Sequence, residues 1–600
     1  MSAVTPNTKE DASEEPNAAM SATMRNDVPP ALAEQRRQSN FALAKLLLSL
    51  FLLLFLIVTL LFCASGGDAL YPAIFPFVPP SFLLHPTAYA CMAVSFLLML
   101  LHAPLYYRGL SRLLRRVPNT DTLVAVSTLA AFGYGMSALS LIPADTAILP
   151  AACALSLSLT LTFAAGGEYL LRRAQRNMGE ALSQADALPL SPSPAAPMSE
   201  RASVPGHIAL IAMLAAVTAG LIWTEIASVS VGAGVFFAVL ITACPIPIGL
   251  VEAVSLHAAM KQGVQSGLLF HDTTAIETAA EINAVVLGKS GFLTAGTPHI
   301  TDIIGEGLTE DTLIGLAASA EANSYHPLAK AIATRAIHLR ARRQRLAATN
   351  EITGCGVETL INGTAVRVGN RRWLEEEHIY LSAGLFTKAD QLEERGKTVL
   401  FVSSGKSAKG LIAFEDEVRP EIPAMLKAFA AAGIEMVLLT GDSLRTAKAF
   451  ARHLHIPKVR ADVPPAEKAK AIQLLQVQGL TVALLDHEAA PDTAQQADLT
   501  VTLCPASPLP LDLPAEKNSR MVFTAKNFTV LPHFFALSRR ATTAIRQNYL
   551  WAFGGSILAM PAALGLLSGV VSALVVPLLP LLASLPALLA ILVNAHRVRL

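Results

Sequence analysis

The sequence alternates between long apolar runs and shorter polar stretches. Each apolar run has roughly the 20 residues that a helix needs to cross a bilayer. The eight runs cover residues 41–64, 87–106, 120–142, 146–171, 207–224, 230–250, 547–567 and 570–593. A largely polar region of mixed pattern extends from residue 251 to residue 544. The pattern therefore predicts an α-helical polytopic membrane domain of about eight spans with one large soluble insert after the sixth.

Composition and charge agree with a membrane protein and predict its orientation. Hydrophobic residues make up 53% of the 600 residues and charged residues 15%, against about 25% charged residues in average chains. The basic residues fall in every second loop, for example in residues 108–116 and 172–176. By the positive-inside rule, we expect both termini and the large insert to be cytoplasmic. We expect an integral, multi-pass protein of the plasma (inner) membrane.

Other bulk features argue against several classes of protein. The net charge of +1 gives no argument for nucleic-acid binding. The six cysteines are widely spaced, which argues against a disulfide framework and against a CxxC metal-binding arm. Residues 1–40 are polar and rich in Ala, Ser, Asn, Glu and Pro, so we expect a disordered cytoplasmic N-terminus.

Within the insert, a short apolar run ends on a loop of small and basic residues. Residues 284–287 read Ala-Val-Val-Leu and predict a buried strand, which ends on Gly288-Lys289-Ser290-Gly291. A strand that ends in such a loop is where an α/β sheet usually places phosphate chemistry. A second apolar run ends on Thr440-Gly441-Asp442. We expect this run, and residues 395–399, to belong to the same doubly wound sheet.

The loop that begins at Gly288 resembles the phosphorylation loop of P-type ATPases, whose consensus is Asp-Lys-Thr-Gly-Thr-Leu-Thr. Here residues 288–294 read Gly-Lys-Ser-Gly-Phe-Leu-Thr, so glycine stands at the position of the nucleophilic aspartate. Eight spans with a large insert after the sixth resemble the heavy-metal (copper-type) class of that family. The resemblance implies a cytoplasmic haloacid dehalogenase-like α/β phosphorylation domain with an inserted α+β nucleotide-binding domain.

The apolar runs and the resemblance together divide the chain into parts. These are a disordered N-terminus (1–40), spans 1–4 (41–171), a short cytoplasmic linker (172–206), spans 5–6 (207–250), a phosphorylation-type domain (251–299 and 398–520), a nucleotide-binding domain (300–397), and a membrane return with spans 7–8 (521–600). The linker stands where the family has its actuator domain. It has roughly 35 residues, fewer than the roughly 50 of a small domain.

The resemblance also implies an ATP site. The family's adenine contacts correspond to Glu321, His326, Gly354, Gly356 and Asn370. Its phosphate-contacting positions correspond to Lys289, Ser290, Thr294, Thr440, Asp442, Lys468 and Asp486. A His-Pro step or a Gly-x-Gly turn alone is typical of an ordinary loop. The order and spacing of the motifs favour the binding of an adenine nucleotide.

Two metal-binding motifs of the family have lost ligand residues in this sequence. The Asn-Asp pair of its magnesium motif corresponds to Ala489-Ala490, which leaves open whether Mg²⁺ is bound. Its Cys-Pro-Cys signature reads Cys244-Pro245-Ile246-Pro247, which keeps one thiolate. A site for a soft metal such as copper normally needs two or three ligands. The other interpretation of Cys244 is a small apolar residue beside a proline kink.

Three functions are therefore considered. The leading hypothesis is a degenerate heavy-metal P-type ATPase, a pseudo-pump that binds ATP without forming an aspartyl-phosphate. It would act as a regulator or as a partner of another transporter or metal-handling protein. The second hypothesis is an active copper or heavy-metal cation transporter with rewired chemistry. The third is a purely structural membrane protein, whose soluble domain binds no nucleotide.

Overall fold

The computed structural model describes most of the chain in two units. The described residues are 30–64, 86–141, 148–184, 204–270, 273–324, 326–342, 346–352, 354–487, 490–503, 519–523, 528–567 and 579–599. One unit comprises Met1–Lys261 with Ala544–Leu600, and the other comprises Gln262–Thr543. Residues 1–29 of the predicted disordered tail, residues 185–203 of the predicted linker and Ala489 lie outside the described residues.

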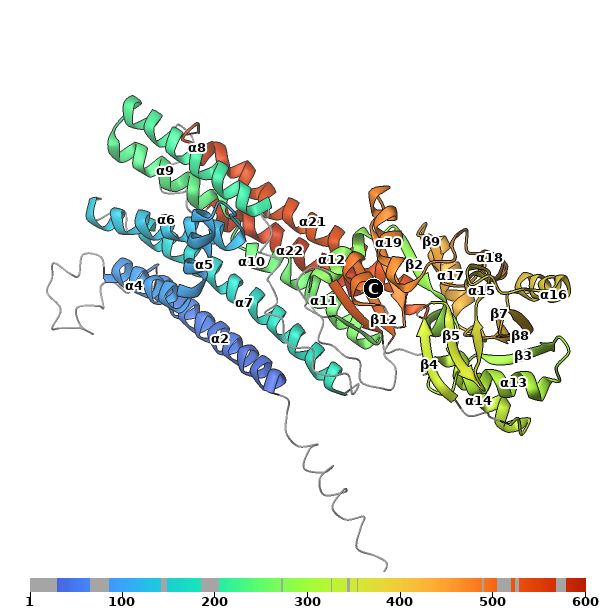
Figure 1. The fold of residues 1–600 in the computed structure, drawn as a ribbon. Coiled ribbons are helices and arrows are strands. Elements are labelled where there is room, and N and C mark those ends of the chain that lie inside the picture. The colour runs from blue at the N-terminus through green and yellow to red at the C-terminus, as the bar shows by residue number, and fades with distance from the viewer. Residues whose placement is uncertain are drawn as a thin grey trace, which may run out of the picture. The chain divides into compact units, whose positions relative to one another are not determined.

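The first unit is helical (Figure 1). Its helices are α2 (Pro30–Ala64), α4 (Pro86–Leu101), α5 (Ala103–Leu114), α6 (Thr120–Leu141), α7 (Ile148–Gln184), α8 (Val204–Ile226), α9 (Val229–Ala243), α10 (Ile248–Val251) and α22 (Leu579–Arg599). Two helices, α11 (Ala253–Gln265) and α21 (Val530–Ala563), continue from one unit into the other.

Several helical segments are long and apolar enough to cross a membrane. Among the described residues there are six, and a seventh if the bent pair α4 and α5 forms one span. The six segments are Leu32–Leu61, Thr120–Leu139, Leu149–Ala181, Val204–Ile226, Val229–Gln265 and Leu579–Val598. The remaining predicted run, 547–567, falls largely in α21, which is not among them. A helical membrane region is thus confirmed, and its span count is approximate.

Two helices extend past the apolar runs that predicted them. Helix α2 begins at Pro30, so residues 30–40, which we expected to be disordered, are helical. Proline suits the first helical position, and the Ala, Leu, Glu, Gln and Arg residues that follow are good helix formers. Helix α7 likewise continues to Gln184, into the predicted linker 172–206.

The predicted second span, 87–106, is a bent helix pair. Helices α4 and α5 meet at His102 with a bend of 70°. Pro104 lies at the start of α5 and has no backbone N–H to donate to the preceding turn, which explains the break.

The second unit contains a seven-stranded sheet. In spatial order its strands are β1 (Leu268–Phe270), β13 (Ser519–Phe523), β12 (Leu499–Leu503), β11 (Val482–Asp486), β2 (Ala284–Gly288), β9 (Glu435–Leu439) and β10 (Lys458–Arg460). All neighbours pair in parallel except β1 and β13. Strand β2 is buried at all five positions. The carboxyl ends of β11, β2 and β9 therefore meet at one edge, where α/β sheets usually bind ligands.

A six-stranded antiparallel sheet is inserted after β2. In spatial order its strands are β3 (His299–Gly305), β8 (Ser407–Glu415), β7 (Thr398–Ser404), β6 (Thr364–Gly369), β5 (Gly356–Ile361) and β4 (Leu346–Ile352). Helices α13 (Glu310–Ala320) and α14 (Pro327–His338) share one apolar cluster with the sheet. Helices α15 (Arg371–Glu376) and α16 (Ala383–Glu394) share a second.

Strand β7 corrects one prediction. Residues 398–399, which we expected in the doubly wound sheet, begin β7, which pairs antiparallel with β6 and β8. The inserted sheet therefore extends to Glu415, beyond the predicted boundary at residue 397. A short apolar run fits either kind of sheet, so its sequence did not distinguish between them.

Candidate functional site

Gly288 lies at the carboxyl end of the central strand β2, directly beside Asp486 at the end of β11. A Cβ atom added to Gly288 would lie 2.4 Å from Oδ1 and 2.7 Å from Cγ of Asp486. Asp486 is 6% exposed, and its Oδ1 accepts a hydrogen bond from the backbone N–H of His487. The Asp486 carboxylate thus occupies the space in which a side chain at position 288 would begin.

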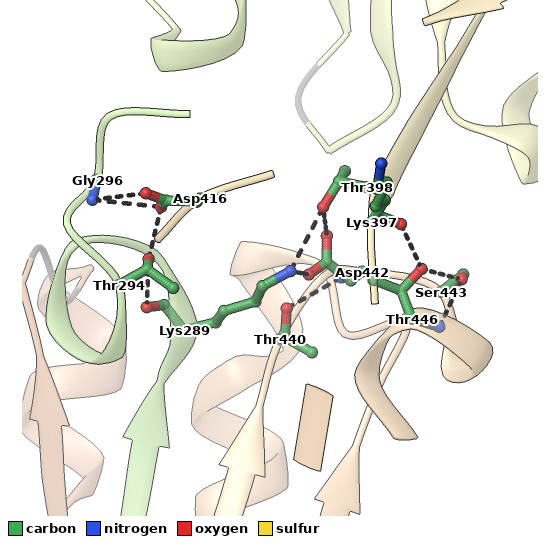
Figure 2. Close-up of polar contacts among 10 residues, drawn as sticks. All are labelled: Lys289, Thr294, Gly296, Lys397, Thr398, Asp416, Thr440, Asp442, Ser443 and Thr446. Atoms are coloured by element: carbon green, nitrogen blue, oxygen red, sulfur yellow. Dashed lines mark hydrogen bonds and ion pairs between the residues drawn. The ribbon is translucent and has the colours of Figure 1, made fainter. Parts of the chain in front are cut away.

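The next residue, Lys289, forms an ion pair with Asp442, which follows the neighbouring strand β9. Its Nζ lies 2.5 Å from Oδ2 of Asp442 and 3.4 Å from Oγ1 of Thr398 (Figure 2). Thr398 also donates to Oδ1 of Asp442, and Thr440 accepts from the Asp442 backbone N–H at 3.1 Å. Lys289 is 8% exposed, so this ion pair is largely shielded from water. The structure therefore brings Lys289, Thr440 and Asp442 together.

Thr294 belongs to a separate part of the same loop. Its Oγ1 donates to Oδ2 of Asp416 at 2.5 Å (Figure 2). Asp416 also accepts from the backbone N–H groups of Gly296 and Thr297. Arg419 donates to the backbone carbonyls of Thr294 and Gly291. Sequence reasoning missed Asp416 and Arg419, which follow the end of β8, a strand that only the structure reveals.

Lys468 and Asp486 form a second ion pair at the strand ends. The Lys468 Nζ lies 3.6 Å from Oδ2 of Asp486. His487 lies over Gly291, whose φ of +77° requires glycine, and a Cβ there would meet the imidazole at 2.7 Å. Each lysine at this edge is therefore paired with its own carboxylate, and Ser290 is exposed.

Glu321 lies at the C-terminal end of α13, and His326 lies at the N-terminal end of α14. Glu321 is 8% exposed, and its pKa is raised to about 7, mainly by burial and to a smaller extent by nearby Glu351. His326 caps α14, its Nδ1 accepting from the Leu328 backbone N–H at 3.2 Å. Ser324 connects this group, donating to Oε1 of Glu351 and accepting from the His326 backbone N–H. Glu351, on β4, was not predicted as a site residue.

Gly354, Gly356 and Asn370 form another group in the inserted sheet. Asn370 donates through Nδ2 to the Gly354 carbonyl, and its Oδ1 accepts from the Trp373 backbone N–H, both at 2.9 Å. A Cβ at Gly356 would lie 2.2 Å from the Val368 carbonyl oxygen. Gly356 is therefore needed for packing between β5 and β6, whatever binds nearby. A Cβ at Gly354 would lie 3.6 Å from Pro465, three residues before Lys468.

Cys244 lies in the helical unit, at the point where α9 ends. Helix α9 ends at Ala243 and α10 begins at Ile248, which confirms the predicted interruption at the two prolines. Cys244 is 3% exposed, and its Sγ lies 3.8 Å from the Pro245 carbonyl. Among the described residues, no group of three or more His, Cys, Asp or Glu side chains could hold a metal ion.

The carboxylates at the strand ends decide whether Mg²⁺ fits there. Magnesium in phosphoryl-transfer sites is usually held by one or two carboxylates together with substrate phosphates and waters. Position 288 supplies no carboxylate, Asp442 is paired with Lys289, and Asp486 is paired with Lys468. The residues described at this edge therefore do not fit a preformed magnesium site.

The comparisons with known proteins agree with this fold. The haloacid dehalogenase-like hydrolase family matches residues 282–492, which contain β2, β9 and β11. The copper-exporting P-type ATPase of Legionella pneumophila is 31% identical over 402 residues, 66% of this chain and 54% of that protein. The probable copper-exporting P-type ATPase V of Mycobacterium tuberculosis is 32% identical over 384 residues, 63% of this chain and 49% of that protein. The chain thus spans about half the length of the curated relatives it matches.

A solved structure extends the likeness to almost the whole chain. The crystal structure of a zinc-transporting PIB-type ATPase in the E2.Pi state has a TM-score of 0.56 and 18% sequence identity. The match covers 92% of this chain and 100% of that chain. At this identity the likeness is one of fold. In sequence, the chain resembles copper-exporting P-type ATPases, and in fold it resembles a zinc-transporting PIB-type ATPase.

Proposed function

We propose that the chain is a pseudo-pump, a heavy-metal P-type ATPase-like membrane protein that binds ATP without forming an aspartyl-phosphate. The observation that carries this proposal is Gly288 at the position of the nucleophile, with Asp486 filling the space beside it. Glycine has no side chain to accept a phosphoryl group. On this proposal the protein regulates, or acts as a partner of, another transporter or a metal-handling protein.

Two further observations support the loss of phosphoryl transfer. Phosphoryl transfer depends mainly on positioning and on metal-assisted stabilisation of charge. The two carboxylates at the strand ends, Asp442 and Asp486, are already neutralised by lysines. In addition, α7 ends at Gln184 and α8 begins at Val204, which leaves less chain than the roughly 50 residues of a small domain such as an actuator.

ATP binding is supported by the inserted sheet. Glu321 is buried and its raised pKa of about 7 keeps much of it uncharged near neutral pH. A protonated carboxyl can donate a hydrogen bond as well as accept one, which suits an adenine edge. His326 and the Gly354 turn lie on the same inserted domain. Under this proposal these residues hold the base, and the paired lysines at the strand ends face the phosphates.

The test is phosphorylation of the purified, full-length protein. The protein is incubated with ATP labelled at the γ-phosphate, with Mg²⁺ and with a soft metal such as copper, and then quenched in acid. We expect no acid-stable, hydroxylamine-labile label, and we expect ATP at millimolar concentration to raise the melting temperature. His326→Ala should reduce this shift. Hydroxylamine-labile label on the wild-type protein would contradict the pseudo-pump.

One observation favours a second candidate, an active copper-type cation transporter with rewired chemistry. The Asp486 carboxylate lies where the nucleophile would begin, so it is the described group placed to replace it. In that case an Asp486 oxygen attacks the γ-phosphorus of ATP, ADP leaves, and an acyl phosphate forms on Asp486. The same assay separates the candidates, because the label would then be lost in Asp486→Asn. Metal-stimulated hydrolysis and vesicle uptake would also be lost in Cys244→Ala.

A purely structural role makes a different prediction. It requires that ATP leaves the melting temperature unchanged, or that any shift is the same in His326→Ala. Either result, together with the absence of label, would contradict the ATP-binding part of the pseudo-pump proposal while leaving the loss of phosphorylation intact.

A further inference from the structure

A hollow lies between helices α2 and α7 in the helical unit. Its volume is about 220 Å³. It is lined by Ser39, Asn40 and Leu43 of α2 and by Tyr169, Arg173, Arg176 and Asn177 of α7. These residues belong to none of the groups described above, and no function discussed so far uses them.

The lining of the hollow suits an anion. Six of the seven lining side chains are polar, two of these are guanidinium groups, and none is a carboxylate. Arg173 donates through Nη1 to the Tyr169 hydroxyl at 3.5 Å, and Arg176 donates through Nε to Glu180 at 3.1 Å. A guanidinium group has five N–H donors, so both arginines retain donors for an anion. Arginine is well matched to phosphate because its donors form a planar fork.

The two helices are joined on both sides of the hollow. They run antiparallel, with Arg36 bound to Glu180 at one end and Lys45 bound to Glu168 at the other. The two α7 carboxylates nearest the hollow are therefore committed to ion pairs. Over residues 30–45 and 166–184 there are six basic and three acidic side chains, so the pair of helices keeps a positive excess.

The hollow lies at the boundary between apolar and polar chain. The apolar runs 41–64 and 146–171 begin or end at its edge, and the polar ends of both helices continue beyond it. Two large apolar side chains in the same stretch of α2 are exposed, Phe41 by 70% and Leu47 by 57%. In a bilayer, such a boundary lies at the level of the lipid headgroups. Acyl chains can then cover Phe41 and Leu47.

We propose that this hollow binds the phosphate group of an anionic phospholipid, held by Arg173 and Arg176. Ser39, Asn40, Asn177 and the Tyr169 hydroxyl supply further hydrogen bonds to the headgroup. Basic pockets between membrane helices are a known way to bind anionic headgroups. A free phosphate offers the same chemistry, but the exposed apolar side chains in this stretch of α2 favour the lipid. The lipid would tie α2 to α7 and stabilise the helical unit.

The test uses the purified, full-length protein in a neutral detergent. Its melting temperature is measured with phosphatidylglycerol, with phosphatidylcholine, with glycerol phosphate and with inorganic phosphate. We expect phosphatidylglycerol to raise the melting temperature more than phosphatidylcholine does, with little effect of the two soluble phosphates. Arg173→Gln/Arg176→Gln should lower the apparent affinity for phosphatidylglycerol at least fivefold. The matched control is Arg112→Gln/Arg115→Gln at the C-terminal end of α5, which removes the same charge outside the hollow and should retain the affinity.

A conservative variant separates binding from folding. Arg173→Lys/Arg176→Lys keeps the charge and loses the fork, so we expect an affinity between the wild type and the glutamine variant. Equal effects of the two lipids on the wild type would overturn the proposal, as would an equal loss of affinity in the α5 control. Stabilisation by inorganic phosphate as strong as that by phosphatidylglycerol would overturn the assignment to a lipid.

Discussion

Gly288 and Asp486 share one small space at the carboxyl edge of the parallel sheet. The Asp486 carboxylate is buried, accepts a hydrogen bond from the His487 backbone and pairs with Lys468. An aspartate at position 288 would place a second carboxylate against the first. Two carboxylates this close disfavour their shared ionised state. The present position of the Asp486 carboxylate therefore requires that residue 288 has no side chain.

Gly288→Asp should destabilise the protein without restoring phosphorylation. The added Cβ would begin 2.4 Å from Oδ1 of Asp486, so Asp486 must move or leave its ion pair. Overpacking of this kind costs about 1–3 kcal/mol of unfolding free energy. The measurements are denaturant unfolding and the hydroxylamine-labile label. Gly288→Ala isolates the steric part, and Gly288→Asp/Asp486→Asn should recover much of the stability. Full stability together with phosphorylation in Gly288→Asp would contradict the prediction.

Glu321 should make the stability of the protein depend on pH. Its pKa is raised from 4.5 in the unfolded chain to about 7 in the folded protein, because the side chain is buried. The folded state therefore holds an extra proton between these values, and stability falls as pH rises from about 4.5 to about 7. Glu321→Gln removes this loss, which is on the order of 1–3 kcal/mol.

The check is the melting temperature of the wild type and of Glu321→Gln between pH 5 and pH 8. We expect the melting temperature of the variant to rise relative to that of the wild type as pH increases, and this difference in melting temperature to level off above about pH 7. Glu306→Gln, at an exposed carboxylate of the same inserted domain, serves as the control. A difference between wild type and Glu321→Gln that stays constant over this range would rule out the raised pKa.

At the scale of elements, the loop after β2 is held by the end of β8. Asp416 follows Glu415, the last residue of β8, and binds the side chain of Thr294 and the backbone of Gly296 and Thr297. Arg419 binds two carbonyls of the same loop. The shape of the loop after β2 therefore depends on a segment more than a hundred residues later in the chain.

Asp416→Ala should loosen this loop. It removes the carboxylate acceptor of two backbone N–H groups and of the Thr294 hydroxyl, which keeps only the Lys289 carbonyl. Hydrogen bonds to a charged group contribute about 1.5–3 kcal/mol each when made. We expect a loss of about 2–4 kcal/mol in unfolding free energy and faster proteolysis near residues 294–297. Asp416→Asn should lose less, because its amide oxygen still accepts. Glu417→Ala, at the exposed neighbour, should behave like the wild type.

At the scale of the whole molecule, the charge pattern predicts which side of the membrane each part occupies. Alkaline phosphatase, which is active only outside the cytoplasm, can be fused after Phe75, Arg116, Lys406 or Leu600. We expect activity only after Phe75, because the linker that contains it lacks Lys and Arg, whereas the stretch before Arg116 is strongly basic. Activity after Lys406 or Leu600 would contradict the predicted cytoplasmic placement of the insert and the C-terminus.

Sequence patterns predicted the main helices and strands but not every strand pairing or helix boundary. The apolar runs predicted the membrane helices, and residues 284–287 predicted the central strand of the parallel sheet. Residues 398–399 were assigned to the wrong sheet, because a short apolar strand reads alike in both. Helix α2 was expected to start too late, because hydropathy marks where a helix becomes apolar and not where it begins.

The candidate site divides in the same way. Lys289, Thr440 and Asp442 were recognised from local motifs, and the structure brings them together. Asp416, Arg419 and Glu351 were missed, because each acts through a contact with a segment distant in sequence. Gly356 was assigned as an adenine contact from its motif, and only the structure shows that it also packs closely against the neighbouring strand β6.

The sequence by itself determined a polytopic helical protein with an α/β insert and with glycine at the position of the nucleophile. These are local properties, because run length, periodicity and residue identity can be read along the chain. Only the tertiary structure decided that Asp486 fills the space at Gly288, that Asp442 holds Lys289, and that α2 and α7 enclose a basic hollow. Each of these depends on which distant side chains meet, and that is settled by packing across the whole fold.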